Sequence, residues 1–441
     1  MTTPIYDFVK KYAESTNVRL HMPGHKGRGA QGTFLETASP MDITEIAGAD
    51  SLFEADGIIA ESEANAAQLY GTEKTLFSAG GSTLCIQAML ALMKQEGRRA
   101  VAVRNAHRAF LAACVLLDIE IEWSYPYYTN SIISAGVSVA EIEKTLSAQN
   151  APCFVYITSP DYFGRMSDIR AISELCGKYN APLLVDNAHG AHLAFMPENL
   201  HPIALGADMC CDSAHKMLPA LTGAAYLHIG NAAYSERAKG AMSLFASTSP
   251  SYLIMESLDL CNVYLSDRIR DDLKRVTERI CALKSKFESI FTFCDGEPLH
   301  LTIYTIYNGI YGNDFADILR SYGIECEYAD REAVVLLFSP LSDDEDFERL
   351  ENALKSIRQL KIRLESEPIV FPRLECCMNM REAALCAYEE IPVEAAEGRI
   401  CAAVKVPCPP AVPIAVSGER ITAECINIYK RYGILSVNVV K

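Results

Sequence analysis

The sequence predicts an α/β protein with a mostly parallel sheet, followed by smaller α+β domains toward the C-terminus. Two observations support this fold class. From about residue 60 onward, short apolar stretches alternate with longer helix-like stretches, which is the pattern of βαβ units around a buried sheet. From residue 299 the order becomes β-α-β-β-α, which predicts a compact α+β domain beside the larger one.

The predicted elements are read from uninterrupted apolar runs and from helical periodicity. Strands of the large domain are expected at 99–105, 119–126, 152–160 and 181–190, with helices at 138–149 and 167–179. The smaller domain has expected strands at 299–305, 324–330 and 333–339, and helices at 314–323 and 343–357. A last helix-like stretch covers 379–391. Because ligands gather at the carboxyl ends of parallel strands, the residues that follow each strand are the candidates for chemistry.

Four segments are expected along the chain. They are an N-terminal arm (1–50), a large domain (51–265), a small α+β domain (266–365) and a C-terminal domain (366–441).

Composition limits the possible partners. The 441 residues include 40 Lys+Arg and 56 Asp+Glu, which gives a net charge of −16. No basic surplus exists to neutralise phosphates, so we expect neither a nucleic-acid partner nor an anionic membrane. The sixteen cysteines show no Cys-x-x-Cys pair, the N-terminus lacks the apolar region of a signal peptide, and no apolar run is long enough for a membrane helix. These features predict a cytoplasmic protein with reduced thiols.

Lys216 is the first candidate for chemistry, because it lies among small and apolar residues. Burying an ammonium group is costly unless the group is paired or neutralised. A Schiff base with an aldehyde would neutralise it, since a lysine with a depressed pKa condenses readily with carbonyl groups. A surface lysine after a strand is the alternative.

Asp186 ends a predicted strand thirty residues before Lys216. A carboxylate there could hold the protonated ring nitrogen of pyridoxal phosphate (PLP), which keeps that ring an electron acceptor. A helix N-cap is the alternative role. Ala188 is small enough for a flat ring to lie over the backbone.

Three further sites follow predicted strands. Gly80 and Gly81 precede Ser82, Thr83 and an apolar helical run, an arrangement that can bind phosphate but that also occurs as a plain helix cap. His107 could stack on a ring or serve as a buried, hydrogen-bonded histidine. His215, next to Lys216, could contact phosphate or transfer a proton.

Seven motifs together, in order, resemble the Orn/Lys/Arg decarboxylase family, whose members are PLP enzymes of the aspartate-aminotransferase fold (fold type I). The chain looks like the short form of the family, without an N-terminal wing domain. The motifs are HMPGHKG (21–27), DITE (42–45), GGST (80–83), RNAHR (104–108), SPDYFG (159–164), DNAHGAH (186–192) and SAHKMLPALT (213–222).

The resemblance implies roles for these positions. Lys216 would form the Schiff base with PLP, Asp186 would pair with the pyridine nitrogen, and His107 would stack on the ring with Ala188 behind it. Lys216 or His215 would protonate the carbon that loses CO₂. The phosphate ligands would be Gly81, Ser82, Thr83, Ser213, His215 and, from a second subunit, the hydroxyls of 247–249 including Thr248. A homodimer or larger assembly with shared active sites is thus implied.

The chain departs from the family pattern at positions near the expected substrate. Asn187 stands where the family usually has Glu, and Asp161 begins the stretch that usually reads Thr-Tyr-Tyr-Gly. The stretches 106–109, 53–57 and 407–413 also differ. These departures make PLP binding a safer prediction than substrate identity.

Several alternatives stay open. The leading hypothesis is decarboxylation of arginine, lysine or ornithine to the corresponding amine. A PLP enzyme of altered reaction, such as an aminotransferase or lyase, and a PLP-binding protein without turnover are the others. Glu45, Glu54 or Glu419 could meet the cationic end of the substrate. The pairs His189 with His192 and His21 with His25 lack further ligands, so we expect no metal.

Overall fold

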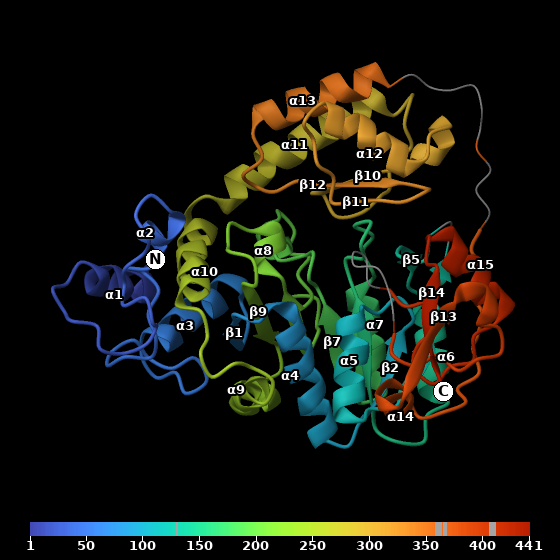
Figure 1. Ribbon diagram of the computed structural model, residues 1–441, viewed down its shortest axis with the longest axis horizontal. Helices are drawn as coiled ribbons and strands as arrows, with labels where there is room; N and C mark the ends of the chain where they lie inside the picture. The colour runs from blue at the N-terminus through green and yellow to red at the C-terminus, as the bar shows by residue number, and fades with distance from the viewer. Residues whose placement is uncertain (129–130, 358–363, 365–367, 405–411) are drawn as a thin grey trace. The chain divides into compact units, whose positions relative to one another are not determined.

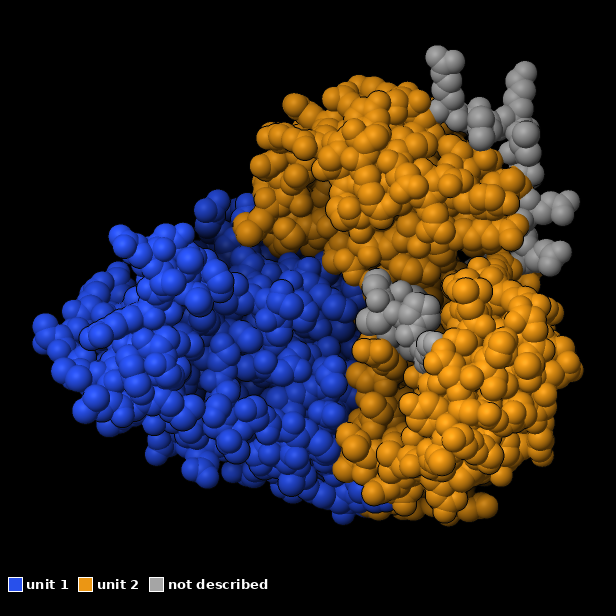
Figure 2. Space-filling model, viewed as in Figure 1, with its two compact units in different colours: residues 1–96, 183–273 blue, residues 97–182, 274–441 orange. Residues whose placement is uncertain are grey.

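The computed structural model describes residues 1–128, 131–357, 364, 368–404 and 412–441. Two compact units, coloured separately in Figure 2, each combine segments that are distant in the sequence. Unit 1 contains residues 1–96 and 183–273, and unit 2 contains residues 97–182 and 274–441. The four expected segments are not these two units, and their boundaries stay a prediction.

Unit 1 contains four strands of the large sheet in the order β1-β9-β8-β7. Their bounds are β1 (Lys74–Ser78), β7 (Leu183–Asp186), β8 (Met209–Asp212) and β9 (Ala225–Ile229). Strands β7 and β8 run parallel, whereas β9 is antiparallel to both β8 and β1. Every residue of β7, β8 and β9 is buried, as expected for a sheet covered on both faces.

The helices of unit 1 are α1 (Pro4–Ala13), α2 (Phe34–Ala38), α3 (Ile58–Tyr70), α4 (Gly81–Gln95), α8 (Ala214–Met217), α9 (Ser235–Ser243), α10 (Tyr252–Asp267) and the start of α11 (Ile269–Phe287). Helix α4 is apolar over most of its surface and packs against β8 and β9. The expected N-terminal arm begins with α1, which buries Ile5 and Val9 and packs against α3 and α10.

Unit 2 begins with three parallel strands in the order β6-β2-β3, which confirms the predicted mostly parallel α/β class. The strands are β2 (Arg99–Val103), β3 (Ile121–Ser124) and β6 (Cys153–Thr158), and the helices between and after them are α5 (Arg108–Leu117), α6 (Val139–Ser147) and α7 (Ile169–Lys178). A two-stranded ribbon joins β4 (Tyr127–Tyr128) to β5 (Ala135–Gly136).

The predicted β-α-β-β-α domain is confirmed. It has a three-stranded antiparallel sheet, β10 (His300–Ile303), β12 (Val334–Leu337) and β11 (Tyr328–Ala329), in that order. Helices α12 (Gly312–Ser321) and α13 (Asp344–Ser356) lie together on one side of this sheet (Figure 1). Helix α13 begins with a capping box between Asp343 and Asp346.

The C-terminal segment contains α14 (Met380–Leu385), β13 (Tyr388–Pro392), α15 (Ala423–Arg431) and β14 (Ser436–Val440). The predicted helix over 379–391 is therefore wrong beyond Leu385. Strand β13 pairs along its whole length with β14, more than forty residues later, and this long-range pairing outweighs the local helical preference.

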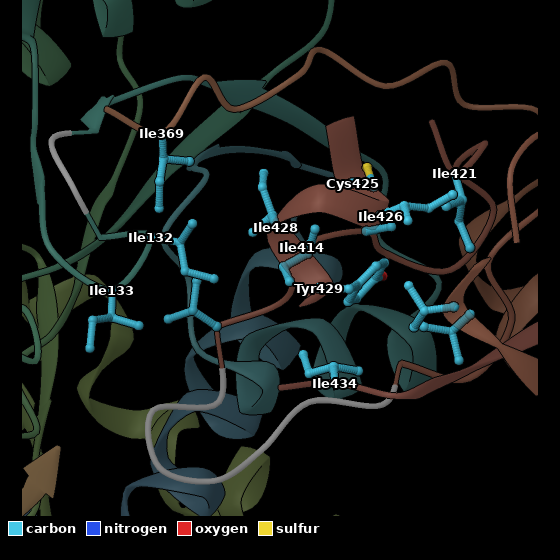
Figure 3. Packing of buried hydrophobic residues seen from close by; sticks show 14 of the residues in the cluster. Ile132, Ile133, Ile369, Ile414, Ile421, Cys425, Ile426, Ile428, Tyr429 and Ile434 are labelled. Atoms are coloured by element: carbon cyan, nitrogen blue, oxygen red, sulfur yellow. The ribbon is translucent and has the colours of Figure 1, made fainter. Parts of the chain in front are cut away.

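An apolar cluster holds this segment within unit 2. Ile428 and Tyr429 of α15 pack with Ile414, Ile434 and, from much earlier in the chain, Ile132 (Figure 3). Such contacts between distant segments bury apolar surface and stabilise the unit. Among the described helices, none combines the length and the apolar character needed to cross a membrane.

Candidate active site

The candidate site of unit 1 lies where β7 and β8 end. Asp186 pairs directly with Cys211 in the parallel register, and the Asn187 N–H donates to the Cys211 carbonyl at 3.0 Å. Because both strands end at the same edge of the sheet, the structure brings the segments after Asp186 and after Asp212 side by side.

Asp186 is almost fully buried at this edge. Its Oδ1 accepts a hydrogen bond from the Ala188 N–H at 3.2 Å and a weak one from the Cys211 Sγ at 3.7 Å. The first contact shapes the turn after the strand, and Ala188 is itself buried there. The arrangement places a carboxylate and a small side chain together, and their predicted roles toward a cofactor ring stay predictions.

Lys216 lies in the short helix α8, half-buried, with its Nζ 3.0 Å from the Nε2 of His189. The ammonium donates and the imidazole nitrogen accepts. From the sequence, His189 was considered only as a metal ligand, so this contact was not predicted. A signal for this contact existed in the sequence. His189 lies three residues after Asp186 at the end of β7, and Lys216 follows β8, the strand that pairs with β7.

The predicted phosphate ligands Ser82 and Ser213 meet in the structure. The Ser213 hydroxyl donates to the Ser82 hydroxyl at 3.0 Å, at the point where α4 begins. The Gly81 N–H donates to the Gly223 carbonyl at 2.8 Å, and Gly81 has a positive φ of 66°, which glycine adopts without strain. Phosphate binding by Gly81 stays a prediction. The next N–H groups, of Ser82 and exposed Thr83, lie in the first turn of α4, where backbone donors have no partner within the helix.

His215 is fixed next to Lys216 by its Nδ1, which donates to the Ala224 carbonyl at 2.9 Å. Burial lowers the pKa of His215, the hydrogen bond to Ala224 opposes this shift, and neighbouring Lys216 adds to it. The imidazole is therefore neutral at pH 7, with Nε2 as its accepting nitrogen.

Two further predicted residues belong to other segments of the chain. Thr248 is exposed in the loop between α9 and α10, and its role for a second subunit stays a prediction. His107 belongs to unit 2, where it follows β2 and caps α5, with its Nδ1 accepting from the Ala109 N–H at 3.1 Å. Ring stacking by His107 likewise stays a prediction.

Asp161 organises its own loop. Its carboxylate accepts hydrogen bonds from the N–H groups of Ala135, Phe163 and Arg165 at 2.9–3.1 Å. Burial raises the pKa of Asp161, and these donors partly offset the shift. Asp161, one of the residues that depart from the family pattern, thus stabilises a backbone turn.

Glu419 is engaged in a buried ion pair with Arg104, at 2.7 Å, and also accepts from the Val416 N–H at 2.8 Å. Burial raises the pKa of Glu419, and Arg104 partly offsets this. The Arg104 guanidinium in turn lies over the Trp123 ring at 4.5 Å. These contacts favour a structural role for Glu419 over binding the cationic end of a substrate.

The end of the stretch 53–57 is hydrogen-bonded to the side chain of Asp50, a residue with a positive φ of 68°. The Asp50 carboxylate accepts from five N–H groups, those of Ser51, Asp56, Gly57, Ile59 and Ala60. Burial alone would raise the pKa of Asp50, but these donors bring it below its ordinary value. Glu45 and Glu54 are exposed nearby in the chain. Of the stretch 407–413, residues 407–411 lie outside the described residues.

Comparisons with known proteins agree with this arrangement. The model of the Orn/Lys/Arg decarboxylase major domain matches residues 3–298, and that of the C-terminal domain of the same family matches residues 372–432. An arginine decarboxylase of Bacillus subtilis (strain 168) is 30% identical over 453 residues, covering 96% of this chain and 92% of the relative. An arginine decarboxylase of Halalkalibacterium halodurans is 30% identical over 450 residues, covering 95% and 91%.

Among solved structures, the Francisella novicida lysine decarboxylase LdcF superposes with a TM-score of 0.85 at 17% identity, covering 100% of this chain and 81% of that one. This likeness, with those to a Sphingomonas wittichii serine palmitoyltransferase and to a structure solved with PLP, confirms the predicted fold type I. Since the major-domain match alone covers more than half of the chain, the protein belongs to the Orn/Lys/Arg decarboxylase family.

Proposed function

We propose that the protein is a PLP-dependent decarboxylase of a basic amino acid, with arginine as its first substrate to test. The observation that carries the proposal is the placement of Asp186 at the end of β7 and of Lys216 in α8, directly after the end of the parallel neighbour β8. Arginine comes first because two relatives with that printed activity match this chain over almost its whole length.

The residues present fit PLP by their chemistry. The cofactor offers an aldehyde, a ring nitrogen and a phosphate, and unit 1 offers an amine at Lys216, a buried carboxylate at Asp186, and the joined hydroxyls of Ser82 and Ser213 at the start of α4. When bound, PLP supplies an aromatic ring that accepts the electrons left behind as CO₂ departs. Ala188 leaves room for a flat ring beside the backbone.

Each residue then has a distinct task. Lys216 binds the cofactor covalently through Nζ. Asp186 holds a proton at the ring nitrogen, because a buried carboxylate beside a pyridinium favours the charged pair. The Ser82 and Ser213 hydroxyls bind phosphate together with the N–H groups of the first turn of α4. His189 holds the Lys216 Nζ, so that this amine can return a proton to the substrate α-carbon after CO₂ has left.

We infer that the protein works in the cytoplasm as a homodimer or larger assembly with shared active sites, without a nucleic-acid or membrane partner. The fifteen cysteines within the described residues are all free thiols, in keeping with a reducing compartment. Thr248 is exposed in the single chain, which a residue that completes the site of a second subunit has to be. The product would be a polyamine-type amine.

A competition assay tests the reaction. The purified protein with added PLP receives arginine, lysine and ornithine together, and mass spectrometry follows the products. We expect an amine lighter than arginine by CO₂. The lysine or ornithine product in its place would correct the substrate, and no amine from protein that still binds PLP would contradict the decarboxylase.

Lys216→Ala is the matched control for the covalent step. Borohydride reduction of the wild type should fix PLP to the peptide that contains Lys216, and the variant should lose this linkage. We expect kcat to fall by at least about 10³-fold, because both covalent binding and proton transfer depend on this amine. A linkage that persists in the variant would mean that another lysine binds the cofactor.

A further inference from the structure

A buried polar cluster lies directly behind the strand ends that carry the candidate site. Its members are Asn187, His201, Asp212 and His228, and all four side chains are fully buried in unit 1. None of them has a task in the proposed reaction. Fully buried polar groups are costly unless they are well paired, so a cluster of this size calls for a reason.

Asp212 is the centre of the cluster. Its Oδ1 accepts from the Asn187 amide at 2.6 Å, and its Oδ2 lies 3.1 Å from the His201 Nε2 and 3.2 Å from the His228 Nε2. The Thr75 hydroxyl lies 2.8 Å from the His228 Nδ1. If that hydroxyl donates to Nδ1, the proton of a neutral His228 is on Nε2, which has no hydrogen-bond partner among the described residues, so its contact with Asp212 is electrostatic.

The charge of the cluster is concentrated on Asp212. Burial raises the pKa of Asp212, but His201 and His228 outweigh this and hold the pKa well below its ordinary value. Burial lowers the pKa of His228. Asp212 is therefore an ionised carboxylate whose two oxygens are both held, and removing either set of partners would leave a buried charge uncompensated.

The cluster ties two strand ends together. Asn187 directly follows Asp186, and Asp212 directly precedes Ser213 and lies four residues before Lys216. The side-chain hydrogen bond from Asn187 to Asp212 runs beside the backbone bond from the Asn187 N–H to the Cys211 carbonyl. Together they set the distance between the segments that hold the ring-binding carboxylate and the lysine.

The cluster lies on the opposite face of the sheet from Asp186. Side chains alternate along a strand, so Asp212 and Cys210 point to the face opposite to Cys211. The Cys211 Sγ contacts the Asp186 carboxylate, which places Asp186 on the other face from the cluster. Without contact, the cluster can act on the site through the position of the strand ends.

We propose that Asn187 and Asp212 are positioning residues that fix the ends of β7 and β8 at the spacing that PLP binding requires. His201 and His228, which lie against the Asp212 carboxylate, keep that carboxylate in place. This inference rests on the proposed function, because it assumes that Asp186 and Lys216 bind PLP. It predicts that the network controls cofactor affinity beyond its contribution to stability.

A metal ion is the competing explanation of the same cluster. The ligand atoms of His201, Cys210 and Asp212 lie within 4.8 Å of one another. Burial raises the pKa of the Cys210 thiol well above its ordinary value, so the thiol is protonated and a poor ligand. The proposal therefore predicts no stoichiometric metal in the purified protein.

A charge-swap series tests the network. In Asn187→Asp a second buried carboxylate would face Asp212, and in Asp212→Asn the histidines would lose their anion. The double variant N187D/D212N restores one carboxylate facing one amide. PLP affinity is measured from the visible absorbance of the lysine-bound cofactor during titration of apoprotein, and the thermal midpoint of the apoprotein reports stability.

We expect each single variant to weaken PLP binding by at least about tenfold, since small misplacements of binding groups cost that much or more. The double variant should regain most of the affinity. The control is Glu63→Gln, which breaks the buried pair of Glu63 with Lys239, 2.8 Å apart, on helices α3 and α9. It should lower the thermal midpoint and leave PLP affinity unchanged.

Three results would overturn the proposal. They are wild-type PLP affinity in Asp212→Asn, an equal loss of affinity in Glu63→Gln, and stoichiometric metal that Asp212→Asn loses. If the single variants do not fold, Thr75→Val removes only the outer hydroxyl and should weaken PLP binding in the same direction. A wild type that binds PLP through Lys216 but decarboxylates no amino acid would refute the proposed function and leave this inference standing.

Discussion

At the scale of single residues, the contact between Lys216 and His189 is the most informative one in the site. The two nitrogen atoms are 3.0 Å apart and come from the segments that follow the neighbouring strands β7 and β8. A lysine that first binds a cofactor and then moves a proton needs its amine held in one place. His189 supplies an accepting nitrogen for this, and it is itself almost fully buried.

This contact gives a prediction for His189. His189→Phe keeps an aromatic ring of similar size but removes the accepting nitrogen, so we expect kcat to fall by about 10²–10³-fold, within the range for groups that assist proton transfer. His189→Gln keeps a polar group near Nζ and should retain more activity. Steady-state kinetics together with the visible absorbance of the bound cofactor measure both effects.

The cofactor absorbance separates two causes of lost activity. If His189 acts through Lys216, the phenylalanine variant should bind PLP and turn over slowly. Wild-type kcat in His189→Phe would show that the 3.0 Å contact has no part in the reaction.

The sequence alone identified residues that the structure brings together, namely Asp186, Ala188, Ser82, Ser213 and Lys216. It could do so because each follows an apolar strand in an ordered motif. It could not find the partner of Lys216 or the cluster around Asp212, because these contacts join side chains from separate segments of the chain. It also could not show that Asp161 and Glu419 have structural roles. A sequence does not reveal whether a carboxylate binds a substrate, a backbone N–H group or an arginine.

At the scale of elements, helix α10 carries an unusual pair of carboxylates. Glu256 is almost fully buried, and its Oε1 has no hydrogen-bond partner among the described residues. Burial raises the pKa of Glu256 to about 8, with the carboxylates of Asp42 and Asp259 adding to the shift. Asp259 accepts from the N–H groups of Ile5 and Tyr6 at the start of α1, and burial raises its pKa to about 6.

Glu256 therefore makes stability depend on pH. Its ordinary pKa is 4.5 and its folded pKa is about 8, so between these values the folded state keeps a proton that the unfolded state releases. The free energy of unfolding thus falls as pH rises through this window, by up to about 1.4 kcal/mol for each pKa unit. Glu256→Gln should remove this fall and raise the thermal midpoint at pH 8, with little change at pH 4.5.

Thermal unfolding at several pH values measures the effect. Glu236→Gln, at an exposed position on α9, is the control and should leave the pH dependence unchanged. A lower midpoint of Glu256→Gln at pH 8 would contradict the prediction, because it would mean that the ionised carboxylate stabilises the fold.

The elements themselves were predictable to differing degrees. Strands such as β2, β6 and β7 were found because they are buried on both faces and read as continuous apolar runs. Strand β13 was missed because it is mostly exposed and its sequence, YEEIP, favours no apolar period. Only its pairing with β14 makes it a strand, and no local pattern records that pairing.

At the scale of the whole molecule, several large apolar side chains of the N-terminal segment are exposed in the single chain. Val18, Leu20 and Phe34 are 80%, 89% and 76% exposed. Exposed apolar groups in this number favour a contact with another chain. They support the proposed assembly, in which Thr248 and its neighbours complete the site of a partner subunit.

Hybrid assemblies test whether the sites are shared. One variant carries Lys216→Ala, and the other replaces the hydroxyls of Ser247, Thr248 and Ser249 by alanine. In a mixed dimer with shared sites, one site receives both defects, whereas the other combines an intact Lys216 with intact hydroxyls from its partner. Mixing the two variants under conditions that exchange subunits should therefore restore decarboxylation, measured against each variant alone.

The same mixture gives the opposite result if each chain completes its own site. Each site of the hybrid would then lack one group, either Lys216 or the hydroxyls of 247–249, and no site would be intact. Activity that stays at the level of the separate variants, although size-exclusion chromatography with differently tagged chains shows that hybrids form, would place Thr248 in the site of its own chain. Once hybrids are shown to form, activity thus assigns the hydroxyls at 247–249 to one subunit or the other, because only the shared arrangement yields an intact site.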